Sequence, residues 1–343
     1  MPDKPTDRTT ARLAWVRRVL DNPGITLEAA SSDASFRSYW RLAHEGQSLI
    51  VMDAPPPQED VHPWLDIGDR LAQAGVHVPS VHASDVEQGI VLIEDFGQRL
   101  YLPELADATA DGLYDDALGA LLRMQSRVAC TDLPVYDAPF LRREMELLAP
   151  WFLERHLGQQ LDAASGKVLN DAFDLLAANG VEQPSCFVHR DFHSRNLMIT
   201  PHDNPGVIDF QGAVCGPITY DLVSLLRDCY IAWDETRVEH WMQGYRQKLI
   251  DHRLIEADVD AARFRRWFDL TGLQRHIKVL GLFCRLAYRD GKPGYLDDLP
   301  RVFDYVLDVA SRYSELARLV ELLRAAGSGR DLRQPAGDAA CAH

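Results

Sequence analysis

The residues best suited to chemistry lie in the stretch 189–196 and at Asp209, thirteen residues after its last position. The stretch reads His-Arg-Asp-Phe-His-Ser-Arg-Asn, and Asp209 stands between an isoleucine and a phenylalanine. Phosphoryl transfer requires a group that orients the attacking hydroxyl and hard oxygen ligands for magnesium. Asp191 suits the first role as a base, and Asn196 and Asp209 suit the second as metal ligands. The pattern predicts a magnesium-dependent phosphotransfer site. The alternative is that these residues only form turns and end a strand.

Short apolar runs surround these residues and predict the strands that position them. The runs are 186–188, 196–200 and 206–210, so the polar side chains fall near strand ends, where a rigid scaffold can aim them into a cleft. The segment 219–228 then has the spacing of a buried helix. Asp221, in the first turn of that helix, is expected either to cap it or to tie back to the catalytic loop.

These motifs resemble those of the aminoglycoside phosphotransferase and choline kinase group of small-molecule kinases, over about residues 10–325. The usual loop of that group is His-Gly-Asp-x-His-x-x-Asn. Here Arg190 occupies the glycine position and gives the His-Arg-Asp form of protein kinases, whereas His193 keeps the small-molecule form. The segments 188–198, 208–211 and 216–222 resemble more specifically the bacterial N-acetylmuramate/N-acetylglucosamine anomeric kinases of cell-wall recycling.

The resemblance implies an α+β, two-lobed protein-kinase-like fold. A β-rich nucleotide lobe is expected over 10–97, a mainly helical catalytic and acceptor lobe over 98–325, and a flexible tail over 326–343. It also implies an enzyme that uses ATP and Mg²⁺ to phosphorylate the anomeric hydroxyl of these amino sugars, giving sugar 1-phosphates in peptidoglycan recycling. The alternatives are a kinase of an aminoglycoside, a choline-like alcohol or homoserine, and a nucleotide-binding regulator without catalysis.

The expected nucleotide lobe lacks the usual phosphate-binding lysine. Runs 25–30, 39–43 and 48–53 predict three strands, and the loop 31–38 has small residues that let backbone amides approach phosphates. The kinase pattern expects its lysine on the third strand. Met52 stands there, and no lysine lies between Lys4 and Lys167. Cationic contacts to phosphate in this lobe are therefore expected from arginine.

Two arginines and a hinge complete the expected nucleotide site. A guanidinium can hold phosphate oxygens in a bidentate fork, although Arg37 and Arg41 could equally be solvated residues of strand edges. The run 90–97 predicts a buried strand that ends in a hinge, and in kinase-like folds such a hinge offers main-chain groups to adenine. The expected nucleotide-binding residues are Ser35, Phe36, Arg37, Arg41 and, through their main chains, Glu94 and Phe96.

The rest of the chain predicts mainly helices, from apolar residues at intervals of three and four. The predicted helices are 64–74, 113–128, 141–156, 167–179, 237–249, 261–288 and 302–325. A sugar with a lactyl carboxylate requires a cation, although long charged side chains commonly cover helices without binding anything. The expected acceptor-binding residues are His193, Arg195, Arg227, His276 and Lys278.

Composition limits the class of partner. The chain has 36 basic and 51 acidic residues and a net charge of −15, which argues against binding to nucleic acid and would also suit a cationic substrate. The sequence has no long apolar run and no signal-peptide core in its first twenty residues. Its six scattered cysteines predict reduced thiols. Composition therefore predicts a cytoplasmic protein that binds neither nucleic acid nor a membrane. The resemblance implies a small-molecule sugar as its partner, and no protein partner is implied.

Overall fold

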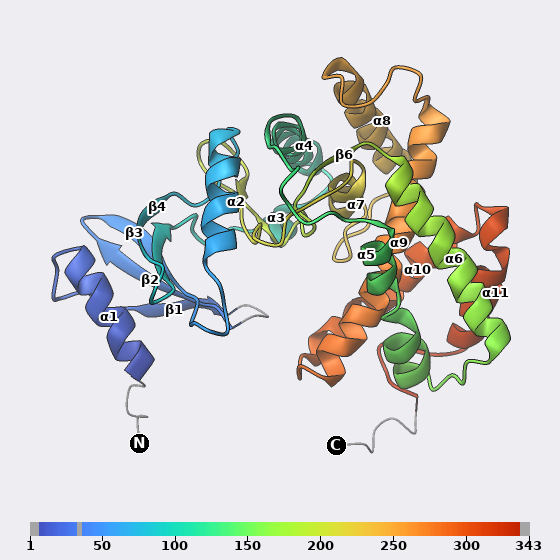
Figure 1. The fold of residues 1–343 in the computed structure, drawn as a ribbon, viewed down its shortest axis with the longest axis horizontal. Helices are drawn as coiled ribbons and strands as arrows, with labels where there is room; N and C mark the ends of the chain where they lie inside the picture. Colours follow the sequence, from blue (N-terminus) through green and yellow to red (C-terminus); the bar gives the residue numbers. More distant parts are fainter. Residues whose placement is uncertain (1–6, 33–35, 337–343) are drawn as a thin grey trace. The chain divides into compact units, whose positions relative to one another are not determined.

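The computed structural model describes residues 7–32 and 36–336, which form two compact units (Figure 1). The first unit comprises the described chain up to Arg123 together with Arg195–Gly212, and the second comprises Met124–Ser194 and the described residues from Ala213 onward. The predicted β-rich part and mainly helical part are both confirmed. The predicted boundary at residues 97 and 98 is displaced, because the chain up to Arg123 and the segment 195–212 fold with the N-terminal sheet.

The first unit is built on a five-stranded antiparallel sheet with the strand order β1-β2-β3-β5-β4. Two two-residue strands, β7 and β8, pair with each other in the same unit. The elements are α1 (Asp7–Val19), β1 (Glu28–Ser32), β2 (Ser38–His44), β3 (Gln47–Asp53), α2 (His62–Gln73), β4 (Val81–Asp85), β5 (Ile90–Glu94), α3 (Tyr101–Glu104), β7 (Leu197–Met198) and β8 (Gly206–Val207). Helix α4 (Ala110–Arg127) begins in this unit and ends in the second.

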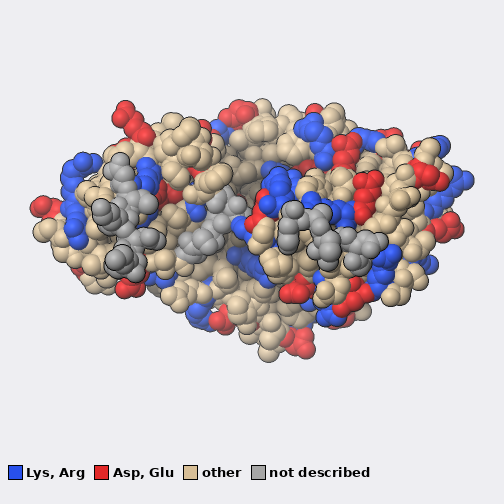
Figure 2. All heavy atoms as spheres, turned by 90° about the horizontal axis from the view of Figure 1, so that it is seen from below, with Lys and Arg blue, Asp and Glu red and all other residues tan. Residues whose placement is uncertain are grey.

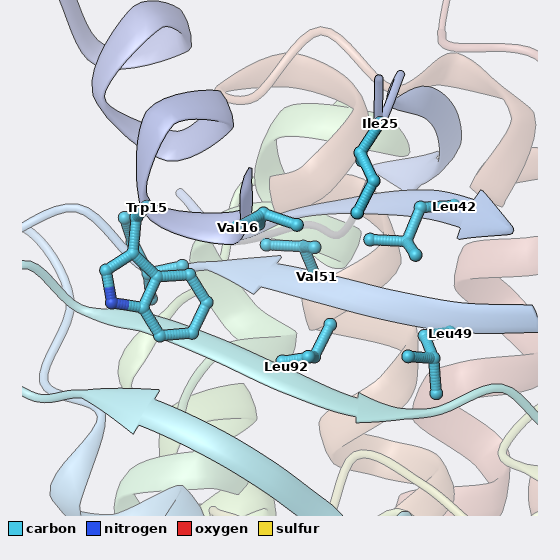
Figure 3. Packing of buried hydrophobic residues seen from close by; sticks show 8 residues of the cluster. Trp15, Val16, Ile25, Leu42, Leu49, Val51 and Leu92 are labelled. Carbon is cyan, nitrogen blue, oxygen red and sulfur yellow. The ribbon is translucent and has the colours of Figure 1, made fainter. Parts of the chain in front are cut away.

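Helix α1 covers one face of the sheet and was not predicted from the sequence. Trp15 and Val16 pack on Leu49 and Val51 of β3, together with Ile25, Leu42, Ile90 and Leu92 (Figure 3). Because side chains alternate along a strand, Met52 points to the opposite face of the sheet from α1. The position of the missing lysine is thus filled by a methionine that is fully buried.

The second unit is mainly helical. Its elements are α5 (Ala138–Met145), a π-helix (Leu148–His156), α6 (Ala163–Glu182), β6 (Ser185–Val188), β9 (Val214–Pro217), α7 (Tyr220–Leu226), α8 (Glu235–Asp251), α9 (Ala261–Tyr288), a 3₁₀ turn (Pro293–Asp298), α10 (Leu299–Ala310), a second 3₁₀ turn (Ser314–Leu316) and α11 (Ala317–Gly327). Helix α9, the long orange helix of Figure 1, contacts α5, α6, α7 and α10. Most of its residues are buried, so it forms the centre of this unit.

Two predictions about the second unit need correction, and one strand was not predicted. The helix expected over 302–325 is two helices, because the chain turns at Ser311 and continues through a 3₁₀ turn before α11. Strand β9, which pairs with β6, was not predicted. The tail expected to be flexible from residue 326 packs against the unit as far as it is described: the imidazole of His156 bonds to the Leu332 carbonyl, and the Ala336 amide donates to the His156 carbonyl at 2.8 Å. Residues 337–343 lie outside the description.

The cysteines differ in part from expectation. Cys130 and Cys215 are joined by a disulfide, whereas Cys186, Cys229 and Cys284 are free and buried. This disulfide corrects the prediction of reduced thiols for Cys130 and Cys215.

Within ranges 7–32 and 36–336, no helix is both long and apolar enough to cross a bilayer. On the face seen in Figure 2, Lys and Arg side chains are interspersed with Asp and Glu.

Candidate active site

The catalytic loop begins after β6 and is held by a carboxylate of α7. Asp221 is fully buried and accepts hydrogen bonds from the backbone amides of His189, at 2.6 Å, and Arg190, at 3.0 Å. Arg190 has a φ of +75°, a conformation that a residue with a side chain adopts rarely. Of the two roles expected for Asp221, the structure shows the tie to the loop. Burial raises the pKa of Asp221 to about 7, the two amide bonds oppose that rise, and the nearby Asp191 charge adds to it.

A second buried carboxylate holds the other end of this loop. Asp228 accepts from the Ser194 amide at 3.0 Å and from the Ser194 hydroxyl at 2.5 Å, both through Oδ2. Its Oδ1 accepts from the Tyr230 amide at 3.1 Å. The Tyr230 ring then meets the His193 ring edge to face, with centroids 5.5 Å apart. Asp221 and Asp228 thus fix the chain on both sides of Asp191.

The charges of four basic side chains act on Asp191. Burial alone would raise the pKa of its carboxyl, but the charges of Lys278, His193, Arg275 and Arg190 outweigh burial and hold that pKa below its usual range. Asp191 is therefore ionised at neutral pH. An ionised carboxylate can accept a hydrogen bond from an incoming hydroxyl, which is the geometry that a base requires.

Glu144 neutralises two of those four cations. Its Oε1 lies 2.5 Å from a guanidinium nitrogen of Arg190 and 2.9 Å from the Lys278 ammonium, and its carboxylate also accepts from the Tyr136 hydroxyl. The predicted acceptor residue Lys278 is therefore beside the base, but its charge is shared with Glu144. Sequence reasoning missed Glu144, because nothing in a helical pattern distinguishes one acidic residue from its neighbours.

The predicted metal ligands, Asn196 and Asp209, lie together in the first unit. The Asn196 amide nitrogen is 3.5 Å from Asp209 Oδ2, and the Ile208 amide donates to the Asn196 carbonyl at 3.1 Å. Asp209 has a φ of +64°, and its side chain is 35% exposed, so the carboxylate remains accessible. The neighbouring Phe210 is fully buried with its ring 5.2 Å from that of Trp64. This aromatic contact anchors the short segment that presents Asp209.

Arg37, the predicted replacement for the missing lysine, lies beside Asp209. A guanidinium nitrogen of Arg37 lies 3.4 Å from Asp209 Oδ1, and its side chain is 9% exposed. Phe36, beside it, is exposed, and its amide donates to Glu59 at 3.1 Å. Ser35, the third predicted residue of this loop, lies outside the described residues. The structure thus places an arginine next to a predicted metal ligand.

Arg41 belongs to the hinge instead of the phosphate site. Its Nε and Nη2 donate to the two Asp95 oxygens at 2.6 and 3.0 Å, and Nη2 also donates to the Gly97 carbonyl at 3.1 Å. Because this paired fork occupies the guanidinium, the predicted phosphate contact of Arg41 is corrected to a role in holding the hinge.

The two predicted hinge residues, Glu94 and Phe96, lie at the end of β5 and just after it. The Glu94 amide donates to the Ser80 carbonyl at 2.9 Å, and the Glu94 carboxylate accepts from the Ser80 amide and hydroxyl. The ring of Phe96 packs edge to face on His77 with centroids 4.6 Å apart. These contacts fix the hinge backbone, on which the predicted adenine contacts depend.

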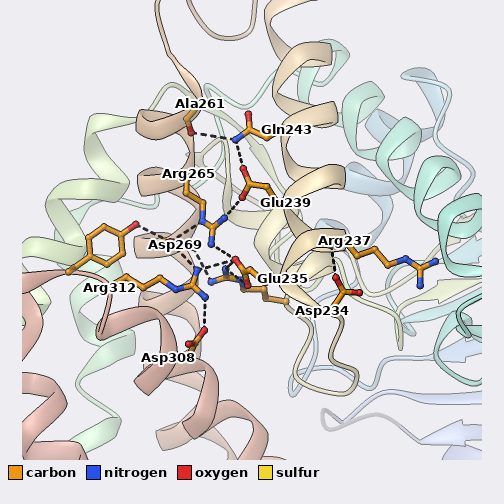
Figure 4. A network of polar contacts seen from close by, with 12 residues as sticks. Asp234, Glu235, Arg237, Glu239, Gln243, Ala261, Arg265, Asp269, Asp308 and Arg312 are labelled. Carbon is orange, nitrogen blue, oxygen red and sulfur yellow. Dashed lines mark hydrogen bonds and ion pairs between the residues drawn. The ribbon is translucent and has the colours of Figure 1, made fainter.

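Two predicted acceptor residues are part of the interior of the second unit. Arg227 is 1% exposed and forms ion pairs at 3.0 Å with Asp269 and Glu235, in the network that includes Arg265 and Arg312 (Figure 4). The His276 ring donates to the Arg227 carbonyl at 2.9 Å and stacks on Tyr305, and burial lowers its pKa to about 3. Both side chains are occupied by structural contacts, so we correct their assignment.

The remaining predicted acceptor residues differ in environment. His193 is buried beside Tyr230, in the same unit as Asp191, whereas Arg195 is exposed and belongs to the first unit. His193 and Lys278 are among the side chains whose charges lower the Asp191 pKa most.

Comparison with known proteins identifies the class that this fold and these residues define. The family described as "Phosphotransferase enzyme family" matches residues 26–264, and the chain belongs to that family. The crystal structure of an ADP-bound aminoglycoside phosphotransferase superposes with a TM-score of 0.59 at 16% identity, covering 85% of this chain and 96% of the other. That likeness confirms the kinase-like fold.

Two curated relatives are far more similar in sequence. The N-acetylmuramate/N-acetylglucosamine kinase of Pseudomonas putida is 46% identical over 303 residues, 88% of each chain. The kinase of the same name from Pseudomonas aeruginosa is 45% identical over 309 residues, 90% of this chain and 91% of the relative. The predicted resemblance to kinases of this group is confirmed.

Proposed function

We propose that this protein is an ATP-dependent kinase that phosphorylates the anomeric hydroxyl of N-acetylmuramate, N-acetylglucosamine or both. The product is the sugar 1-phosphate, as an intermediate of peptidoglycan recycling in the cytoplasm. The observation that carries the proposal is the agreement between an intact, ionised Asp191 in a doubly held loop and the names of relatives that match almost the whole chain.

Asp191 acts as the base in this reaction. Its carboxylate accepts the proton of the anomeric hydroxyl, the sugar oxygen forms a bond to the terminal phosphorus of ATP, and the bond from that phosphorus to the bridging oxygen breaks to release ADP. Because Lys278, His193, Arg275 and Arg190 lower its pKa, Asp191 is a weak base. A weak base suits an anomeric hydroxyl, which is the most acidic hydroxyl of a free sugar because the ring oxygen stabilises its oxyanion.

Asn196 and Asp209 are the residues proposed to hold Mg²⁺. Among the residues that the structure describes, no group of three or more His, Cys, Asp or Glu side chains is arranged to hold a metal. One carboxylate with one amide is what magnesium takes when nucleotide phosphates and water complete its six ligands. When bound, the ion neutralises charge on the phosphates. Arg37, 3.4 Å from Asp209, adds a second cation that can hold a phosphate oxygen.

The nucleotide is proposed to bind along the loop before β2 and at the hinge. Ser35 and Phe36 are proposed to offer backbone amides to the phosphates, which requires the Phe36 amide to exchange its bond to Glu59 for one to phosphate. Glu94 and Phe96 are proposed to offer main-chain groups to adenine. Arg41 keeps the hinge in place through Asp95. His193 and the Tyr230 ring beside it are proposed to line the acceptor, because the apolar face of a sugar packs well on aromatic rings.

A panel of acceptors with labelled ATP tests this proposal. The panel comprises N-acetylmuramate, N-acetylglucosamine, an aminoglycoside, choline and homoserine, each with and without Mg²⁺. We expect labelled phosphate on the two amino sugars only, and Asp191→Asn should lower turnover by about 10²–10⁴-fold with unchanged folding. Transfer only to another acceptor would show that the proposed sugar substrates are wrong. ATP binding without transfer to any acceptor would indicate a nucleotide-binding regulator.

A further inference from the structure

One buried cation beside the base has no carboxylate partner. Arg275 of α9 is 5% exposed, and its Nη1 donates to the Cys229 sulfur at 3.3 Å. Its Nε is buried without a hydrogen-bond partner. In the part of the chain that the structure describes, no carboxylate lies within 4 Å of this guanidinium. Arg275 is therefore a buried charge whose hydrogen-bonding capacity is only partly used.

The other arginine and lysine beside Asp191 do not share this property. Arg190 and Lys278 both form ion pairs with Glu144. A buried charge costs several kcal/mol of desolvation unless opposite charges and hydrogen bonds offset that cost. The charges of Asp191 and Asp228 act on Arg275 and favour its cation, but they leave its buried Nε without a hydrogen-bond partner. A ligand carboxylate can use this remaining hydrogen-bonding capacity.

Arg275 lies on the same side of α9 as Lys278, because residues three apart share one face of a helix. Lys278 pairs with Glu144, which also pairs with Arg190 of the catalytic loop, and the charges of Arg275 and Lys278 both act on Asp191. The adjacent His276 turns instead to the Arg227 carbonyl. An acceptor must place its reacting hydroxyl against Asp191, which brings its other substituents near the groups that surround that carboxylate.

We propose that Arg275 is the specificity-determining residue that binds a carboxylate carried by the acceptor, namely the lactyl carboxylate of N-acetylmuramate. A guanidinium fork holds a carboxylate through two parallel hydrogen bonds, which the buried Arg275 can offer at little further entropic cost. N-acetylglucosamine lacks the lactyl group and gains nothing from this contact. The inference rests on the proposed function and adds to it a residue that distinguishes the two sugars.

The test compares three acceptors with the full chain and its variants. Steady-state kcat/KM is measured for N-acetylmuramate, its neutral lactyl amide and N-acetylglucosamine. In the unchanged protein we expect the acid to be preferred over the amide. Arg275→Gln should lower kcat/KM for the acid by about 10- to 100-fold relative to N-acetylglucosamine, the loss expected for a hydrogen-bonded charge pair. It should also abolish the difference between acid and amide.

Matched variants separate recognition from folding. Arg275→Lys keeps the charge, so it should retain part of the preference for the acid even if Arg275→Gln folds poorly. Arg266→Gln, which removes an exposed α9 arginine paired with Glu315, should leave all three values unchanged. The ratio between sugars is the readout, because any effect of Arg275 on Asp191 acts on every acceptor alike.

Failure of the inference about Arg275 can be told apart from failure of the proposed kinase function. An equal loss for all three acceptors in Arg275→Gln would overturn the inference and assign Arg275 to the transferred phosphate or to structure. Equal kcat/KM for the acid and the amide in the unchanged protein would overturn it without any variant. Transfer to neither sugar in the unchanged protein would instead refute the proposed function.

Discussion

Removing the Asp228 carboxylate is expected to loosen the catalytic loop without touching a reacting group. Asp228 is fully buried, and its three hydrogen bonds come from the Ser194 amide, the Ser194 hydroxyl and the Tyr230 amide. Ser194 follows the base by three positions. Asp228 therefore positions the part of the loop between Asp191 and the predicted metal ligand Asn196.

The size of the effect follows from those bonds. A hydrogen bond to a charged group contributes about 1.5–3 kcal/mol. In Asp228→Asn, an amide NH₂ group replaces one carboxylate oxygen and faces an N–H donor, so at least one hydrogen bond is lost. The unfolding free energy should therefore fall by about 1.5–3 kcal/mol. Asp228→Ala leaves all three donors unpaired, and its loss should exceed about 4 kcal/mol. A displacement of the base by about 1 Å should also lower kcat by about 10²-fold.

Denaturant unfolding and steady-state kinetics measure the two effects separately. Asp269→Asn is the matched control, because Asp269 is also buried but its ion pairs join Arg227, Arg265 and Arg312 (Figure 4). This control should lower unfolding free energy and leave the kcat of the folded fraction unchanged. If Asp228→Ala kept both the stability and the kcat of the unchanged protein, the positioning role would be wrong.

Three further changes test other parts of the structure. Arg37→Met should lower kcat/KM for ATP by about 10- to 100-fold, and a smaller effect than that of Arg41→Met would contradict the assignment of Arg37 to phosphate. Glu235 has a pKa lowered to about 2, since the charges of Arg227, Arg265 and Arg312 outweigh burial. The ionised Glu235 carboxylate therefore stabilises the folded protein above pH 4.5, and this stabilisation is lost as the pH falls towards 2. Because the side chain is half exposed, the loss in unfolding free energy is about 1 kcal/mol. Glu235→Gln should flatten thermal stability over that range, and parallel curves would refute this. Trp15→Ala should lower unfolding free energy by about 3–5 kcal/mol if α1 is part of the core, whereas an unchanged midpoint would show that α1 is dispensable.

The catalytic loop was the part of the site most open to prediction from sequence. Asp191, Asn196 and Asp209 could be proposed from the sequence because phosphoryl transfer requires these residue types at this spacing; their roles stay predictions. The bounds expected for the long helix, 261–288, are those of α9. A long run of apolar periodicity identifies a helix well, because it persists over many turns.

The same helix explains why the acceptor residues were assigned less well. Most of α9 is buried, so no polar stripe shows which direction each side chain takes. Successive residues of a helix differ by about 100°, and Arg275 and His276 therefore face different neighbours. The sequence offered His276 and Lys278 as candidates, whereas the structure shows that Arg275 is the cation without a carboxylate.

Long-range packing accounts for the remaining differences. Trp15 and Val16 of helix α1 pack on Leu49 and Val51, more than thirty residues further along the chain. A short polar N-terminal segment gives little local signal of that contact. The break after α10 likewise depends on where Ser311–Tyr313 turns back. Arg41 looks like a phosphate ligand in sequence because its ion-pair partner, Asp95, is 54 residues distant.

The position of the phosphate on the product tests the central claim most directly. The protein is incubated with ATP, Mg²⁺ and N-acetylglucosamine or N-acetylmuramate, and the product is analysed by phosphorus NMR with proton coupling. The account predicts a phosphate coupled to the anomeric proton and a product that has lost its reducing end. A phosphate coupled to the C6 protons, or no sugar phosphate with either acceptor, would contradict it.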